Sequence, residues 1–330
     1  DSSDERYSAQ DLLQRFEYFC VESEDIIPAA SDALAEGDIA KFARQVDRSQ
    51  QYTETMLCNM VPQTIFLAKT AKKLGAAAAS AFGAGFGGIY ALYRLRGMGL
   101  KVRVFEAGSG VGGTWFWNRY PGARCDVESM QYSYQFSDEL QQEWDWTEKY
   151  ATQPEIMRYA NHVVDRFDLR RDIQLNTRVI AAHFDEQSNR WQIQTGDGAQ
   201  VSAKYCLMAT GCLSSANMPN MKGLDSFKGP VYHTGEWPHE PVDFTGQRVA
   251  IIGTGSSAVQ SIPIIAKQAK HLYVFQRTPN YAVPARNAPL APEVRSAIKA
   301  DYAGLRHRAL QMPTGFAFEF NRKPALEVTP

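Results

Sequence analysis

The sequence predicts an α/β fold, with two Rossmann-like, dinucleotide-binding domains preceded by an α-helical N-terminal extension. Two glycine-rich turns support the domains, because each is followed by a helical segment and then by a strand that ends in a charged residue. Apolar residues at helical spacing before the first turn support the extension. A chain of 330 residues is long enough for about two domains.

The first turn has the spacing G-x-G-x-x-G at Gly83, Gly85 and Gly88. Glycines at this spacing let the backbone approach a pyrophosphate and direct a helix N-terminus at its charge. The strand expected at 101–106 ends in Glu106, which is placed to accept hydrogen bonds from a ribose. The glycines alone also fit a simple tight turn. The helix, the strand and Glu106 in this order favour a dinucleotide site.

The residues before this turn do not fit a buried parallel strand. Residues 74–82 are rich in alanine, where such folds normally place a run of Val, Ile and Leu. We expect three parts in the chain: a helical extension at 1–75, a first and incomplete domain at 76–212, and a second incomplete domain with the start of a helical insertion at 213–330.

Composition argues against several classes of protein. There are 35 Lys and Arg against 36 Asp and Glu, so the net charge of -1 gives no reason to expect nucleic acid or an anionic membrane as partner. No apolar run is long enough to span a bilayer, and no secretory signal is present. The 5 cysteines form no C-x-x-C pair, so neither a metal site nor a disulfide framework is expected, and a reducing cytoplasm is the predicted location. The chain starts at Asp1 and ends at Pro330 in mid-pattern, so we expect a fragment.

A longer motif follows the first strand. Residues 112–126, GGTWFWNRYPGARCD, resemble the flavin-side fingerprint of the Baeyer-Villiger monooxygenases, with Gly113, Tyr120, Pro121 and Gly122 at the family's spacing. An aromatic core patch followed by a turn would explain the tryptophans but not the whole pattern. The resemblance implies that the following residues contact cofactor: Thr114, Trp115, Phe116, Trp117, Arg124, Asp126 and Tyr132.

A second long motif resembles the same family at residues 227–238, with Phe227, Gly229, His233 and Trp237 at fixed spacing. A lone histidine is usually a satisfied structural residue. In the family it lies between the two dinucleotide domains, so the resemblance implies a linker role for His233 rather than proton transfer.

The second glycine-rich turn follows an apolar strand that starts at Arg248, and alanine replaces its third glycine. Its predicted cofactor contacts are Gly253, Thr254, Gly255, Ser256, Ser257, Arg277 and Thr278. Arg277 stands where Glu106 stands in the first motif. An acid there would bind ribose hydroxyls, whereas an arginine can bind a 2′-phosphate, although a solvated surface arginine is the alternative. The contrast assigns FAD to the first site and NADPH to the second.

The resemblance to Baeyer-Villiger monooxygenases runs from about Gly83 to the end. The sequence is closely similar to the phenylacetone and steroid monooxygenase branch of that family. It implies hydride transfer from NADPH to FAD and use of O2 to insert one oxygen beside a ketone carbonyl. Asp126 is the predicted catalytic residue, because a carboxylate beside the flavin can orient an arginine that stabilises developing negative charge. No arginine in this chain matches that partner, and Arg124 fits a nicotinamide-cofactor contact instead. The 330-residue chain is therefore expected to oxygenate ketones poorly.

Residues 8–88 carry a different resemblance, to the C-terminal part of galactokinase-like (GHMP) sugar kinases, on the sequence from Glu54 to Gly88. The family's ATP-binding loop and catalytic residues are not found, so phosphoryl transfer is not implied. A chimera joined at the shared glycine motif is expected. Three alternatives stay open: a sugar-kinase remnant, a dinucleotide-binding module without redox chemistry, and an N-oxygenating flavin monooxygenase.

Three further structural expectations follow from the pattern. Residues 173–210 alternate like antiparallel strands, with a hairpin turn at Asp197-Gly198, and residues 205–211 resemble a strand that returns toward the flavin. Most aromatic residues of 128–170 are expected to form core. Residues 292–310 have helical spacing, and the charges near their end are expected to form a solvated face.

Overall fold

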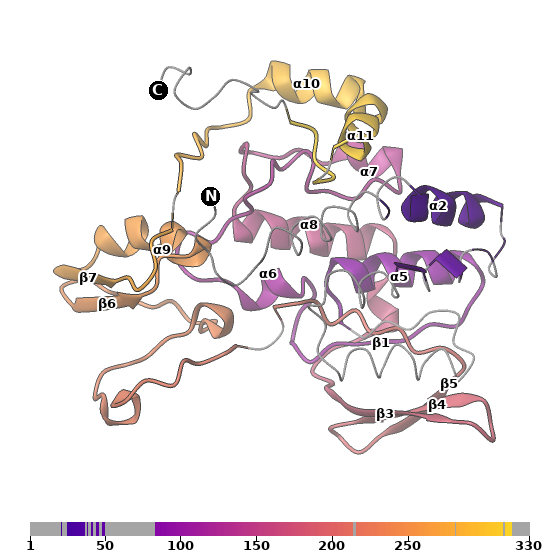
Figure 1. Cartoon of the computed structure of the whole chain (residues 1–330), viewed down its shortest axis with the longest axis horizontal. Coiled ribbons are helices and arrows are strands. Elements are labelled where there is room, and N and C mark those ends of the chain that lie inside the picture. Colours follow the sequence, from indigo (N-terminus) through magenta and orange to yellow (C-terminus); the bar gives the residue numbers. More distant parts are fainter. Residues whose placement is uncertain are drawn as a thin grey trace. The chain divides into compact units, whose positions relative to one another are not determined.

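The computed structural model describes residues 21, 25–36, 38, 41, 44–45, 48–49, 83–213, 216–280, 282–312 and 314–318. The chain divides into two units, one formed by Asp1–Phe82 with Val179–Met208 and the other by Gly83–Arg178 with Ala209–Pro330. Figure 1 labels the elements in chain order. The alanine-rich segment at 74–82 and most of the predicted extension lie outside the described residues. The predicted domain boundaries at 75 and 212 stay predictions.

The first unit contains a helix and an antiparallel sheet. Helix α2 spans Ile27–Ala35, and the sheet has the order β3-β4-β5, with β3 at Val179–Asp185, β4 at Arg190–Thr195 and β5 at Gln200–Ala203. Strands β4 and β5 are joined at Gly198, which adopts a φ of 86° that glycine tolerates without strain. The predicted hairpin is confirmed, and its turn is closed by the Gly198 amide donating to the Thr195 carbonyl at 3.0 Å.

Two strand predictions are corrected. Residues 173–174 form β2, Ile173–Gln174, which pairs in parallel with β1, Val104–Phe105, rather than in the antiparallel sheet. This pairing buries Ile173 and Val104 together in the apolar core, which an exposed antiparallel edge would not. Residues 205–211 form no strand. Only Met208 is in a bridge, so the segment lacks the run of paired residues that a strand needs.

The second unit begins with the predicted turn, helix and strand. Helix α5, Phe86–Gly97, starts at the glycine-rich turn and leads to β1. The segment between β1 and β2 then supplies α6, Thr114–Trp117; α7, Asp138–Glu143; α8, Gln153–Arg166; and the short 3-10 helix η3, Arg170–Asp172.

Helix α8 buries one face in the core of this unit. Ile156, Tyr159, Ala160, Val163 and Val164 are buried, and they follow the i, i+3, i+4, i+7, i+8 spacing of an amphipathic helix. The predicted aromatic core is confirmed. Trp146 is only 1% exposed, and Tyr134, Phe136 and Trp144 pack against the same cluster.

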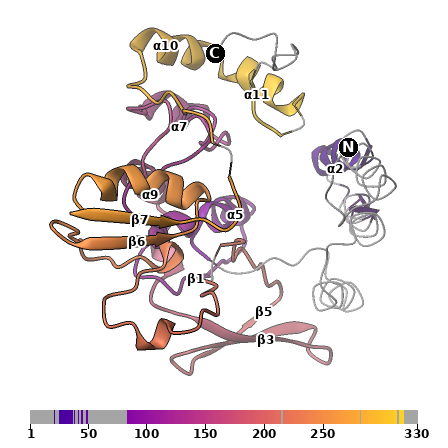
Figure 2. The ribbon, with the colours of Figure 1, turned by 60° about the vertical axis from the view of Figure 1, so that its left-hand side comes forward.

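The second turn lies between two parallel strands. Strand β6, Arg248–Ile252, pairs with β7, His271–Phe275, in register from Arg248↔His271 to Ile252↔Phe275. Helix α9, Ser256–Ala266, connects them and lies against the pair in both views (Figures 1 and 2). The short 3-10 helices η4, Leu224–Ser226, and η5, Thr234–Glu236, precede β6. Among the described residues, no helix is both long enough and apolar enough to cross a membrane.

The helical spacing at 292–310 corresponds to two helices, α10 at Pro292–Ala300 and α11 at Tyr302–Leu310. Asp301 separates them, because its backbone leaves the helical region at φ -138° and its carboxylate accepts the Gly304 amide at 2.9 Å to cap α11.

The predicted solvated face of this segment is wrong for Arg306. Its guanidinium donates to the Gln131 carbonyl at 2.9 Å and to the Ser133 hydroxyl at 2.9 Å, and it lies over the Tyr302 ring. Burial lowers the pKa of Arg306 from its ordinary value. The prediction fails because residues of the segment 131–141, distant in sequence, supply hydrogen-bond acceptors. These acceptors offset the free-energy cost of burying the cation.

Replacement of Arg306 tests this docking. Arg306→Met removes a charged donor from half-buried acceptors, so we expect the free energy of unfolding to fall by about 2 kcal/mol. Arg308→Met is the control, because Arg308 and its partner Asp301 are 58% and 59% exposed and such a pair contributes at most about 1 kcal/mol. Urea denaturation measures both. Equal losses in the two variants would contradict the docking role.

Candidate functional site

Glu106 ties together the loops of the first glycine-rich turn. Its side chain is buried, with 6% exposed, at the carboxyl end of β1. One carboxylate oxygen accepts the Ala84 amide at 2.7 Å and the other accepts the Gly108 amide at 2.8 Å. A carboxylate has about four acceptor sites, so each oxygen retains capacity for a hydroxyl donor. The predicted ribose contact is compatible with this geometry and stays a prediction.

Close backbone approach explains two of the predicted glycines. A Cβ at Gly88 would lie 1.7 Å from the Gly83 carbonyl oxygen, which is impossible without unfolding the turn. A Cβ at Gly113 would lie 2.7 Å from the Cα of Gly85, so the two glycine loops touch each other. The Gly112 amide also donates to the Ala84 carbonyl at 2.7 Å. The sequence predicted each loop, and the tertiary structure brings them together.

The fingerprint helix α6 presents its aromatic side chains in different directions. Phe116 is buried against Gly108 and Gly110, where a Cβ would lie within 2.7 and 2.8 Å of its ring. Trp115 donates its indole N–H to the Tyr132 hydroxyl at 2.9 Å, and their rings meet edge to face at 5.9 Å. Burial raises the pKa of Tyr132, so its hydroxyl stays protonated at neutral pH. The structure therefore joins two predicted flavin-side residues. Trp117 packs at right angles to Phe116.

An open cleft of about 360 Å³ lies beside this helix. Its lining is made by two segments that the sequence separates, Arg119–Arg124 and Thr152–Pro154. Within the lining, Gln153 donates to the Trp115 carbonyl at 2.6 Å. A residue of the cleft lining is thus hydrogen-bonded to the fingerprint helix α6.

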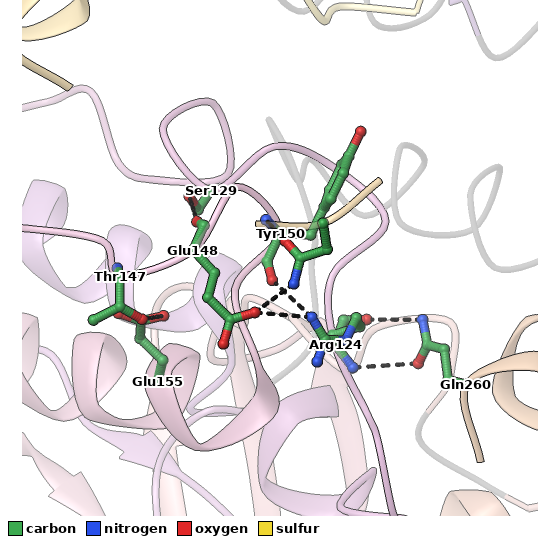
Figure 3. A network of polar contacts seen from close by, with 8 residues as sticks. Arg124, Ser129, Thr147, Glu148, Tyr150, Glu155 and Gln260 are labelled. Carbon is green, nitrogen blue, oxygen red and sulfur yellow. Dashed lines mark hydrogen bonds and ion pairs between the residues drawn. The ribbon is translucent and has the colours of Figure 1, made fainter. Parts of the chain in front are cut away.

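Arg124 is held by an acidic partner. Its guanidinium lies 3.0 Å from Glu148 and 3.4 Å from the Tyr150 carbonyl (Figure 3). Asn287 binds the same Glu148 carboxylate and accepts the Tyr150 amide at 3.0 Å. The sequence predicted Arg124 as a cofactor contact but did not indicate Glu148 or Asn287, because neither belongs to a local motif. The cofactor contact stays a prediction.

Gln260 on α9 is a further residue that sequence reasoning missed. Its amide nitrogen donates to Asp126 at 2.8 Å and to the Arg124 carbonyl at 3.1 Å. Its amide oxygen accepts the Tyr120 hydroxyl at 3.0 Å and the Arg124 amide at 3.2 Å. The available signal was that Gln260 is the one long polar side chain in the otherwise small and apolar helix SSAVQSIPIIA. Asp126, the predicted catalytic residue, is exposed and takes Gln260 as its partner.

The second turn has the features expected of a nucleotide site. Gly253 adopts a φ of 103°, and its amide donates to the Phe275 carbonyl at 2.8 Å. Helix α9 begins after Gly255 without a side-chain cap, so its first amides have no side-chain acceptor. Thr254 accepts Gln276 at 3.1 Å and Asn280 at 3.2 Å, two contacts that the motif did not indicate. Ser256 and Ser257 open α9, and Arg277 and Thr278 are exposed two and three residues after the end of β7.

The motif around His233 forms a local turn in this structure. The His233 Nδ1 accepts the Gly235 amide at 3.0 Å and thereby caps η5. Trp237 packs on Tyr232 and Phe244, and the exposed Phe227 ring covers Gly229. These contacts are structural, and none of the motif's side chains lines the cleft described above.

Comparison with known proteins defines the class. Residues 82–312 match the family model described as pyridine nucleotide-disulphide oxidoreductase, and the chain belongs to this family. Within it, the chain is 46% identical over 249 residues to a Baeyer-Villiger monooxygenase of Pseudooceanicola batsensis, which covers 75% of this chain and 46% of the relative. It is 47% identical over 221 residues to a phenazine N-monooxygenase of Lysobacter antibioticus, in an alignment that covers 67% of this chain and 40% of the relative.

A solved structure gives the same relationship. An oxidized steroid monooxygenase bound to NADP is 57% identical, with a TM-score of 0.70 over 75% of this chain and 47% of that one. The chain therefore spans about half the length of the relatives that it matches. None of these relatives supports the sugar-kinase resemblance of residues 8–88 or the chimera, and both stay predictions.

A matched pair of glycine variants tests the first turn. Gly88→Ala must displace the Gly83 carbonyl, so we expect a loss of about 3 kcal/mol or more in the free energy of unfolding. Gly87→Ala places its Cβ at an ordinary 3.8 Å from Ala209 and is expected to change stability by less than about 1 kcal/mol. Thermal unfolding, with hydrogen exchange of the Gly112 amide, measures both. Equal thermal unfolding midpoints for Gly88→Ala and Gly87→Ala would contradict the close contact between Gly88 and the Gly83 carbonyl.

Proposed function

We propose that this chain is the FAD- and NADPH-binding part of a Baeyer-Villiger monooxygenase, which inserts one oxygen atom of O2 beside a ketone carbonyl to give an ester or lactone. The observation that carries the proposal is the paired arrangement of the two turns. The first turn leads through helix α5 into β1, which is followed by the buried acid Glu106, whereas the second turn leads through helix α9 into β7, which is followed two residues later by the exposed base Arg277. The fingerprint at 112–126 and the monooxygenase relatives support the reaction.

The first turn fits FAD. The tight contact between Gly85 and Gly113 leaves no room for side chains where a pyrophosphate would approach, and the amino end of α5 carries no side-chain cap. Glu106 would hold ribose hydroxyls with its remaining acceptor sites. Trp115 and Tyr132 would form an aromatic wall that excludes water from the flavin side.

The second turn fits NADPH. The amino end of α9 would receive the pyrophosphate, and Arg277 would bind the 2′-phosphate through charge-assisted hydrogen bonds. When bound, the two cofactors supply hydride transfer and oxygen activation. The chain's own part is to bind and orient them, with Asp126 held by Gln260 of α9. An arginine partner for Asp126, which the family resemblance implies, has no match in this chain.

Disulfide redox chemistry, which the family name suggests, is not favoured here. Burial raises the pKa of Cys125 to about 11 and that of Cys206 to about 11, so both thiols stay protonated and poorly nucleophilic at neutral pH. Both are free, as is Cys212. Free thiols also support the proposed cytoplasmic location.

The visible absorption spectrum of the purified chain tests the function. We expect a bound flavin that bleaches when NADPH is added without oxygen. Retention of NADPH without any flavin would instead favour a dinucleotide-binding module without redox turnover. Ketone turnover by the chain alone is a separate question, and efficient turnover would overturn the expectation that it oxygenates ketones poorly. ATP binding would favour the sugar-kinase alternative for residues 8–88.

N-oxygenation is the second candidate reaction, because a relative 47% identical to this chain is a phenazine N-monooxygenase. Ketone and amine or N-heterocycle substrates, offered to the flavin-loaded protein with NADPH and O2, distinguish the two reactions. An ester or lactone product supports the Baeyer-Villiger reaction, and an N-oxide without ester supports the second.

Arg277 should decide between the two nicotinamide cofactors. Arg277→Ala removes the proposed partner of the 2′-phosphate, and the loss of such a charged contact, about 1.5–3 kcal/mol, corresponds to an NADPH dissociation constant raised about 10- to 100-fold. NADH affinity should stay unchanged. Arg248→Ala is the control, because Arg248 is exposed at the far end of β6 from the turn. Fluorescence titration with both cofactors measures the effect, and unchanged NADPH affinity would refute the assignment.

A further inference from the structure

The side chain of Gln260 uses all four of its hydrogen-bonding positions on the loop at 120–126. A carboxamide has two donors and two acceptor sites. The two donors go to Asp126 and to the Arg124 carbonyl, and the two acceptor sites take the Tyr120 hydroxyl and the Arg124 amide. The pairing with the main chain of Arg124 resembles one rung of a β-ladder made by a side chain (Figure 3).

The loop is shaped to receive helix α9 at this point. Gly122 adopts a φ of 82°, and a Cβ there would lie 2.4 Å from the Gln260 carbonyl oxygen. The same Cβ would lie 3.0 Å from Ile264, one turn further along α9. A glycine at position 122 thus permits the helix backbone to pack directly on the loop, at the distance that lets the Gln260 side chain reach Tyr120, Arg124 and Asp126.

We propose that Gln260 is a positioning residue that fixes the Asp126 carboxylate and joins the fingerprint loop at 120–126 to the helix of the second nucleotide turn. This rests on the proposed function. As a consequence, the distance between Asp126 on the flavin side and helix α9 on the nicotinamide side stays fixed. Hydride transfer needs such a fixed distance, because the reacting atoms must lie within about 3–3.5 Å. Asp126 is exposed, so without the Gln260 donor its carboxylate would be free to rotate into water.

Few charged groups face position 260. On the loop side these are Asp126, the Arg124 guanidinium that is paired with Glu148, and Tyr120, whose pKa burial raises and whose hydroxyl also contacts Ser257. Helix α9 itself contains no charged residue. A carboxylic acid introduced at 260 would therefore have Asp126 as its nearest carboxylate, and that negative charge would raise its pKa.

Gln260→Glu gives the first test, measured as the anaerobic rate of flavin bleaching at saturating NADPH. The neutral acid, present at low pH, can donate to Asp126, whereas the ionised form has no donor and repels it. We expect a rate within about threefold of wild type near pH 5 and at least about tenfold below wild type near pH 8, with the NADPH dissociation constant changed far less. A pH profile parallel to that of wild type would overturn the proposal, since a merely space-filling role is not sensitive to this ionisation.

Gln260→Met gives a test that needs no cofactor. It keeps the volume and removes all four hydrogen bonds, so exchange of the Arg124 amide hydrogen should accelerate about tenfold or more, while the Cys125 amide, which donates to Ala151 at 3.0 Å, should not change. Gln268→Met is the matched control, because the one hydrogen bond of the Gln268 side chain within the described part of the chain is accepted from the Phe244 amide and does not involve the loop at 120–126.

The two tests separate the inference from the function on which it rests. If the wild-type chain holds no flavin but Arg124 exchange accelerates in Gln260→Met alone, the proposed function fails and the positioning contact stands. If Arg124 exchange is the same in Gln260→Met and Gln268→Met, the positioning role is refuted, whatever flavin the chain retains.

Discussion

The buried carboxylate of Glu106 is the contact on which the first nucleotide turn depends. It accepts one amide from the glycine-rich turn at Ala84 and one from the following loop at Gly108, and so joins segments on either side of helix α5 and strand β1. A buried carboxylate is costly unless it is hydrogen-bonded, and the two backbone donors offset that cost. Both donors come from glycine-containing loops, so the carboxylate holds the backbone of these two loops close to the end of β1.

A second set of contacts joins the loop at 120–126 to more distant segments. Gln260 binds it from α9, and Glu148 binds Arg124 while Asn287 bonds both Glu148 and the main chain at Tyr150. The loop therefore has fixed neighbours on two sides. A catalytic constellation gains from such support, because small displacements of a positioned group cost much of its effect on rate.

The relatives define the class more firmly than the reaction. This chain matches a Baeyer-Villiger monooxygenase and a phenazine N-monooxygenase at nearly equal identity, 46% and 47%. This is expected physically, since the cofactors carry the oxygen chemistry and the surrounding pocket selects the substrate. The glycine turns, Glu106 and the fingerprint helix are proposed to bind the cofactors, and this proposed role does not distinguish a ketone from a nitrogen base.

The sequence by itself determined the local elements: both glycine turns with their helices, the hairpin at Asp197-Gly198, the aromatic core, and the acid and base that follow the two strands. These could be predicted because each depends on residues close together in the chain. The tertiary structure alone decided that Gln260 meets Asp126, that Glu148 neutralises Arg124, and that Arg306 is packed inward rather than solvated. Each of these contacts joins residues that are 24 or more positions apart. A polar side chain's partner across such a separation is set by packing, which leaves no periodic signal in the sequence.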